Sequence, residues 1–104
     1  MLNESRQPEA VTRQFLRWFW ALLERLVFER RQALLYFWMG APLLPYAPAQ
    51  TLSPAPSIVL RPPDAALPTA NTCISRLYLP LYGDKHTLRL KLLTAIQTSS
   101  FGFV

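Results

Sequence analysis

Cys73 is the residue of this chain best suited to chemistry, and it is the only cysteine among 104 residues. The thiolate form of a cysteine is a strong nucleophile, so an accessible thiol at the end of a loop can carry covalent catalysis. Cys73 follows a proline-containing loop, and its neighbours Asn71, Thr72 and Ser75 are able to hydrogen-bond a thiolate or an oxyanion. The alternative is a buried structural cysteine, because free cysteine also packs as a small hydrophobe. Composition and position leave both interpretations open.

The other residue types that support catalysis form no matching pattern. His86, the only histidine, falls in the expected first turn of a helix beside Lys85 and Arg89, which favours a solvated face over a cysteine–histidine pair. The six carboxylates include no close pair for acid–base hydrolysis. One cysteine and one histidine do not make a metal site, and three distant glycines do not make a phosphate-binding loop. We therefore expect no metal and no cofactor.

Composition and charge narrow the class of protein. Hydrophobic residues make up 51% of the chain and charged residues 16%, which is typical of one small globular domain. The net charge of +5 is spread over single or paired basic residues, so a nucleic-acid partner is not expected. Charged residues interrupt the most apolar stretch, residues 15–38, so it is not a membrane span. A single cysteine and no secretory signal favour an intracellular location, in cytoplasm or nucleus.

Two helices are expected in the first forty residues. Residues 1–8 are expected to form a loose lead-in with Ser5 and Pro8 as helix-start signals, and a helical pattern follows from Glu9. Steps of three and four residues place one apolar stripe on that helix: Val11, Phe15, Trp18, Phe19, Leu22 and Leu26. Trp20 lies off the stripe and is expected to be exposed or to face a partner. A second helix is expected over about residues 29–39, ended by Gly40 in a left-handed conformation.

Strands and one more helix are expected in the second half. The proline-rich residues 41–56 predict an extended connection, and residues 57–61 predict a short strand. Residues 64–72 are expected to form a loop, followed by an irregular entry at Ile74 into a strand that ends at Pro80. Asp84 is a candidate N-cap for a last helix that presents one apolar face: Leu88, Leu92, Ala95 and Ile96. This order predicts an α+β fold in which a small β-sheet packs against an N-terminal helical pair and one C-terminal helix.

Residues 67–82 (LPTANTCISRLYLPLY) resemble the active-site motif of HECT ubiquitin ligases. That motif runs Leu-Pro-x-Ala-x-Thr-Cys, then an apolar residue, then x-x-Leu-x-Leu-Pro-x-Tyr. The matching positions here are Leu67, Pro68, Ala70, Thr72, Cys73, Ile74, Leu77, Leu79, Pro80 and Tyr82. So many fixed positions are hard to match by chance, and the resemblance favours a reactive Cys73 over a structural one.

The resemblance extends over about residues 10–104. The pair Phe19–Trp20 is similar to one in the first helix of the family's C-terminal lobe, and the FGFV ending places Phe101 fourth from the end, as in the family. Residues 56–64, residues 70–82 and this ending are most similar to the hyperplastic-discs (EDD) type of ligase. Many HECT ligases have His before Thr-Cys and Phe-Asn after it, where this chain has Asn71 and Ile74-Ser75. Roles given to those side chains elsewhere in the family therefore do not transfer.

The resemblance implies a two-step acyl transfer with Cys73 as the catalytic residue. Cys73 would accept ubiquitin as a thioester from a ubiquitin-conjugating enzyme and pass it to a lysine of a protein substrate. Leu67, Pro68, Asn71 and Thr72 would support the active-site loop, and Phe101 would belong to a tail that orients the loaded lobe. The implied organisation is a hinge or linker remnant over residues 1–9, a HECT C-lobe over 10–98 and a C-terminal tail over 99–104.

The resemblance also implies that this lobe works with a larger N-terminal lobe. In the family, that lobe docks the conjugating enzyme and is joined through a flexible hinge, near which this chain begins. A second hypothesis is therefore a folded ubiquitin-binding module that is catalytically inert without the N-lobe. A third is a basic amphipathic protein that binds a membrane or nucleic acid, which a steep salt dependence would reveal.

Overall fold

The computed structural model describes residues 2–5, 7–40 and 56–101, with side chains as far as residue 97. Three helices and a four-stranded sheet follow one another as β1 (Leu2–Asn3), α1 (Glu9–Arg25), α2 (Phe28–Met39), β2 (Ser57–Arg61), β3 (Thr69–Asn71), a 3₁₀ turn η2 (Thr72–Ile74), β4 (Arg76–Pro80) and α3 (Lys85–Phe101). The predicted α+β class, the helical pair and the C-terminal helix are confirmed. The extended connection predicted over residues 41–56 lies outside the described residues, apart from Pro56.

The sheet has the strand order β1-β2-β4-β3. β2 lies between β1 and β4 and is parallel to both, whereas β3 is antiparallel to β4. The prediction of a loose lead-in is wrong for Leu2 and Asn3, because they pair with Val59 and Leu60 of β2. The prediction of a loop over residues 64–72 is also wrong at residues 69–71, which form β3.

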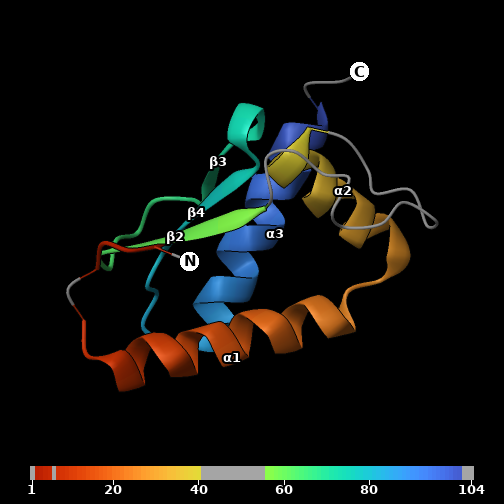
Figure 1. Cartoon of the computed structure of the whole chain (residues 1–104). Coiled ribbons are helices and arrows are strands. Elements are labelled where there is room, and N and C mark those ends of the chain that lie inside the picture. Colours follow the sequence, from red (N-terminus) through yellow and green to blue (C-terminus); the bar gives the residue numbers. More distant parts are fainter. Residues whose placement is uncertain (1, 6, 41–55, 102–104) are drawn as a thin grey trace.

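All three helices lie on one side of the sheet, as Figure 1 shows, and α3 contacts both α1 and α2. Between these layers lies one core, to which the alternating residues of β2 and β4 contribute one face. Its members with almost no exposed surface are Phe15, Phe19, Leu34, Leu60, Leu77, Leu79, Leu88 and Leu92. Burial of these side chains is the main force that fixes α2 and α3 against the strand that follows Cys73.

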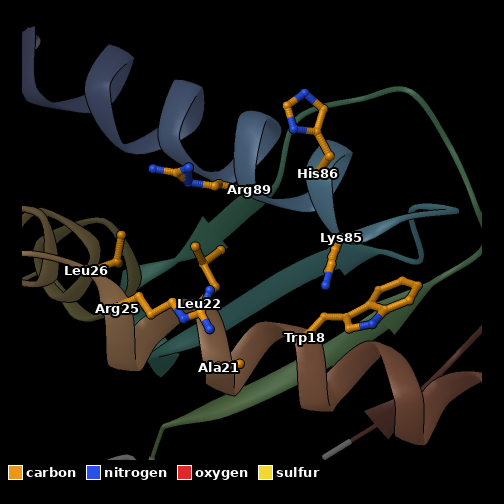
Figure 2. Close-up of a pocket in the computed structure, with 8 residues that line it drawn as sticks. All are labelled: Trp18, Ala21, Leu22, Arg25, Leu26, Lys85, His86 and Arg89. Atoms are coloured by element: carbon orange, nitrogen blue, oxygen red, sulfur yellow. The ribbon is translucent and has the colours of Figure 1, made fainter.

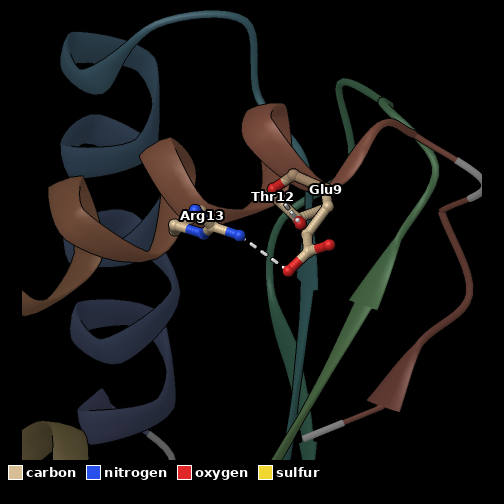
Figure 3. Close-up of polar contacts among 3 residues, drawn as sticks. All are labelled: Glu9, Thr12 and Arg13. Atoms are coloured by element: carbon tan, nitrogen blue, oxygen red, sulfur yellow. Dashed lines mark hydrogen bonds and ion pairs between the residues drawn. The ribbon is translucent and has the colours of Figure 1, made fainter.

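Local signals in the sequence set the helix ends. Asp84 caps α3 as predicted, since its carboxylate accepts hydrogen bonds from the backbone N of Thr87 at 2.7 Å and from its hydroxyl at 3.0 Å. These bonds, the backbone one first, lower the pKa of Asp84. Gly40 ends α2 with φ 79°, also as predicted. At the start of α1, Arg13 pairs with Glu9 at 2.7 Å (Figure 3), an exposed pair of the kind that adds little to stability.

The apolar stripe predicted for α1 is correct except at its start. Phe15 and Phe19 are buried, but Val11 is 44% exposed and Thr12 is buried in its place. Thr12 tolerates burial because its hydroxyl donates to the carbonyl of Glu9 at 2.9 Å. Trp20 is 49% exposed, as predicted. No helix in the described part of the chain is both long and apolar enough to cross a bilayer.

Candidate functional site

Cys73 is a free, solvent-exposed thiol in the middle of the 3₁₀ turn η2. The turn connects β3 to β4, so antiparallel strands hold both of its ends. This position excludes the buried structural cysteine that composition had left open. It also confirms the irregular entry predicted at Ile74, because the chain must reverse between two paired strands there.

Residues on each side of Cys73 fix the backbone of the turn. Asn71 is the N-cap of η2, and its Oδ1 accepts a hydrogen bond from the backbone N of Cys73 at 3.2 Å. Ser75 adopts the left-handed conformation, with φ 50° and ψ 46°, and its N donates to the carbonyl of Thr72 at 3.2 Å. Since a left-handed non-glycine residue is uncommon and costs free energy, surrounding contacts must hold it.

The C-terminal end of α2 supplies those contacts. Trp38 Nε1 donates to the carbonyl oxygen of Ser75 at 2.9 Å and to that of Ser57 at 3.2 Å. Gly40 lies against the turn, because a Cβ atom placed on it would be 3.2 Å from the Cβ of Thr72. One helix end therefore contacts the turn both before and after Cys73. Figure 1 shows this end of α2 close to the turn that follows β3.

The loop that leads into β3 is anchored at its middle. The hydroxyl of Tyr82 donates to the carbonyl of Ala66 at 2.5 Å, and the N of Ala66 donates to Asp64 Oδ1 at 3.0 Å. Burial, and then the nearby charge of Asp64, raise the pKa of Tyr82, so its hydroxyl remains a donor. Pro68 is buried and Leu67 is 37% exposed. These hydrogen bonds fix the backbone of the loop that leads to Cys73.

The structure brings together some of the predicted site residues and separates others. Asn71, Thr72 and Cys73 are adjacent in one turn, with Leu67 and Pro68 just before β3. His86 is exposed on the first turn of α3, as expected of a solvated residue. This end of α3 lies near α1 and away from η2 (Figure 1). Phe101 is the last residue of α3, so that helix includes residues 99–101 of the predicted tail. Residues 102–104 lie outside the described part.

Sequence reasoning missed Trp38 and Tyr82 as supports of this site. Trp38 is one of the apolar residues of the second predicted helix, and a buried indole N–H needs an acceptor, so burial of Trp38 predicts a polar contact. Tyr82 was noted only as a motif position, and its bond to Ala66 spans 16 residues. In the described ranges, no three His, Cys, Asp or Glu side chains are grouped so that they could hold a metal.

Comparison with known proteins shows which protein family this chain matches. Residues 4–104 match the model of the HECT-domain (ubiquitin-transferase). The chain is 48% identical over 103 residues to the E3 ubiquitin-protein ligase hyd of Drosophila melanogaster, an alignment that covers 98% of the chain. It is 36% identical over 88 residues, 85% of the chain, to mouse Apoptosis-resistant E3 ubiquitin protein ligase 1. It is 42% identical over 93 residues, 84% of the chain, to human E3 ubiquitin-protein ligase HECW2.

The chain spans only a small part of these relatives. It corresponds to 4% of the Drosophila protein, 11% of the mouse protein and 6% of the human one.

Proposed function

Because the chain belongs to the HECT family of ubiquitin transferases, we propose that it is the ubiquitin-accepting C-lobe of such a ligase and that Cys73 is its catalytic residue. The observation that carries the proposal is the exposed thiol in a turn held from both sides. A nucleophile fixed in this way loses little entropy when it meets an acyl donor, which favours the reaction.

The proposed reaction has two balanced steps. The Cys73 thiolate attacks the carbonyl of the thioester between ubiquitin and a ubiquitin-conjugating enzyme; a new C–S bond forms, the old one breaks, and the enzyme's thiolate leaves. A substrate lysine amine then attacks the new thioester, an isopeptide C–N bond forms, and the Cys73 thiolate is released. The amine loses its proton to a base that we place outside this chain, on the N-lobe or the substrate.

Neighbouring residues act on the position of the thiol. Asn71 holds the amide of Cys73, and Thr72 packs against Gly40, so both fix the direction from which the thioester is approached. Leu67 and Pro68 hold the preceding loop in place. An intracellular site of action, in cytoplasm or nucleus, follows from the same proposal, because the conjugating enzymes and substrates of this pathway are expected there.

The serine variant tests the covalent step. Cys73→Ser replaces the thioester by an oxygen ester, which thiols do not cleave and alkali does. We expect the variant, fused behind a HECT N-lobe and given charged conjugating enzyme, to accumulate a ubiquitin adduct that survives reductant and is lost in hydroxide. An adduct that reductant removes, or that alkali leaves intact, would place ubiquitin on another residue.

A truncation tests the proposed tail. Deletion of residues 101–104 is expected to slow transfer to lysine more than loading of Cys73, because the tail orients the loaded lobe and takes no part in bond formation. Loading and discharge are measured separately in single-turnover gels. Equal loss of both steps, or of neither, would contradict this role.

A second function remains for the lobe in isolation. A chain that spans 4% to 11% of the cited relatives can bind ubiquitin without turnover if the conjugating enzyme docks elsewhere in the whole protein. Binding of free ubiquitin by the isolated chain, together with no loading of Cys73 unless an N-lobe is fused, would support this alternative.

A further inference from the structure

A groove of about 450 Å³ lies between α1 and the first turns of α3. Figure 2 shows Trp18 and Leu22 of α1 facing Lys85 of α3 across it, while His86 points away from α1. Its lining consists of Trp18, Ala21, Leu22, Arg25, Leu26, Lys85, His86 and Arg89. α1 and the start of α3 lie at the end of the molecule opposite the turn that carries Cys73 (Figure 1), so the function proposed above does not use the groove between them.

The groove combines an apolar lining with an excess of positive charge. Trp18, Leu22 and Leu26 give it apolar surface, while Arg25, Lys85 and Arg89 contribute three cations and no carboxylate lines it. Within the described ranges, the one ion pair joins Arg13 to Glu9, so none of these three cations is paired with a carboxylate.

The helix dipole of α3 adds to the positive potential of the groove. The start of α3 carries the positive end of a 17-residue helix dipole. Asp84, the N-cap of α3, offsets part of this potential, because its carboxylate keeps its negative charge while it accepts hydrogen bonds from Thr87. A ligand that reaches the groove therefore meets cations that attract an anion.

We propose that this groove binds an acidic segment of a partner protein, with one apolar side chain of the segment seated on Trp18 and Leu22. Charge complementarity selects the acidic residues, and the apolar lining selects the side chain between them. A volume of about 450 Å³ is enough for one large side chain with its neighbouring backbone. Nucleic acid fits less well, because Trp18 is the one large aromatic side chain of the lining and aliphatic side chains provide the rest of its apolar surface.

Fluorescence anisotropy with a defined peptide tests the proposal. The probe is a fluorescein-labelled Glu-Asp-Glu-Phe-Asp-Glu peptide, titrated with the full 104-residue chain. The groove variant is Lys85→Glu with Arg89→Glu, and the matched control is Arg17→Glu with Arg30→Glu, whose side chains are exposed and lie outside the groove. Both double variants change the net charge equally, and far-UV circular dichroism checks their fold.

The expected result is a loss of affinity of about tenfold or more in the groove variant and of less than about threefold in the control, because only the groove charges contact the peptide. Replacing the peptide's Phe by Ser is expected to weaken binding to the native chain by about tenfold.

Equal losses in both variants would show attraction to net charge alone and would overturn the proposal, as would undetectable binding or no effect of the Phe replacement. Displacement of the peptide by inorganic phosphate or phosphatidylserine vesicles at matched charge would assign the groove to phosphate groups instead. If the charge-reversed protein does not fold, Lys85→Gln with Arg89→Gln gives the same comparison against Arg17→Gln with Arg30→Gln.

Discussion

The hydrogen bonds of Trp38 give the most direct test of how the Cys73 turn is supported. Trp38→Phe keeps an aromatic ring in the core but removes the Nε1 donor that contacts the carbonyls of Ser75 and Ser57. Ser75 is the left-handed residue that brings the chain out of the turn into β4. Removing the donor therefore weakens the contact that holds this uncommon conformation.

The magnitude follows from two contributions. Loss of the hydrogen bonds from Nε1 costs about 1 kcal/mol of stability. This cost is at the low end of the range for a buried acceptor, because the Ser75 carbonyl still accepts a bond from the N of Ser57 at 2.9 Å. Trp38 is only 6% exposed, so the missing part of the indole removes buried apolar surface worth about 1–2 kcal/mol. We expect Trp38→Phe to lower the free energy of unfolding by about 2–3 kcal/mol.

Urea unfolding followed by far-UV circular dichroism measures this change, because the signal does not depend on the substituted tryptophan. The matched control is Trp20→Phe, the same substitution at a side chain that is 49% exposed. We expect the control to change stability by less than about 0.5 kcal/mol. In a fusion with an N-lobe, Trp38→Phe is expected to slow loading of Cys73 under conditions where the lobe is fully folded, because the turn is no longer held.

Equal destabilisation by Trp38→Phe and Trp20→Phe would refute the reasoning, because burial and hydrogen bonding would then make no difference. Normal loading by a destabilised Trp38→Phe lobe would leave the fold account intact and contradict the link from α2 to the Cys73 turn.

Two further substitutions test the remaining supports of the site. Gly40→Ala is expected to cost about 1–2 kcal/mol, since a Cβ is strained at φ 79° and lies 3.2 Å from Thr72, whereas Gly83→Ala meets no atom within 4 Å and serves as the control in the same urea experiment. Tyr82→Phe is expected to destabilise by about 1 kcal/mol through loss of the Ala66 bond. Because folding raises the pKa of Tyr82 above 10, the stabilisation by its neutral hydroxyl is complete below pH 10 and declines above it. A stability difference between native and Tyr82→Phe proteins that grows above pH 10 would contradict this pH dependence.

The sequence predicts the elements that have strong local patterns. The strand at residues 57–61 was placed with the observed ends, and both Gly40 and Asp84 were identified at the helix ends, since each depends on nearby residues alone. The irregular entry at Ile74 is also predicted, because this residue breaks the alternation of the strand that follows.

Elements that depend on distant partners were missed. β3 contains Thr69, Ala70 and Asn71, which have no apolar alternation, and the strand exists because it pairs with β4. β1 has only two residues and depends on β2 in the same way. For the candidate site, the motif predicts Cys73 and its neighbours, whereas the bond from Trp38 crosses 37 residues to Ser75 and no local pattern predicts it.

A thioester assay tests the central claim most directly. The chain is fused behind a HECT N-lobe and mixed with a ubiquitin-charged conjugating enzyme, and native and Cys73→Ala forms are compared on non-reducing and reducing gels. We predict a ubiquitin adduct of the native protein that reductant removes and that Cys73→Ala abolishes. A reducible adduct that persists in Cys73→Ala, or no adduct while a control ligase discharges the same enzyme, would contradict the assignment of Cys73 as the ubiquitin acceptor.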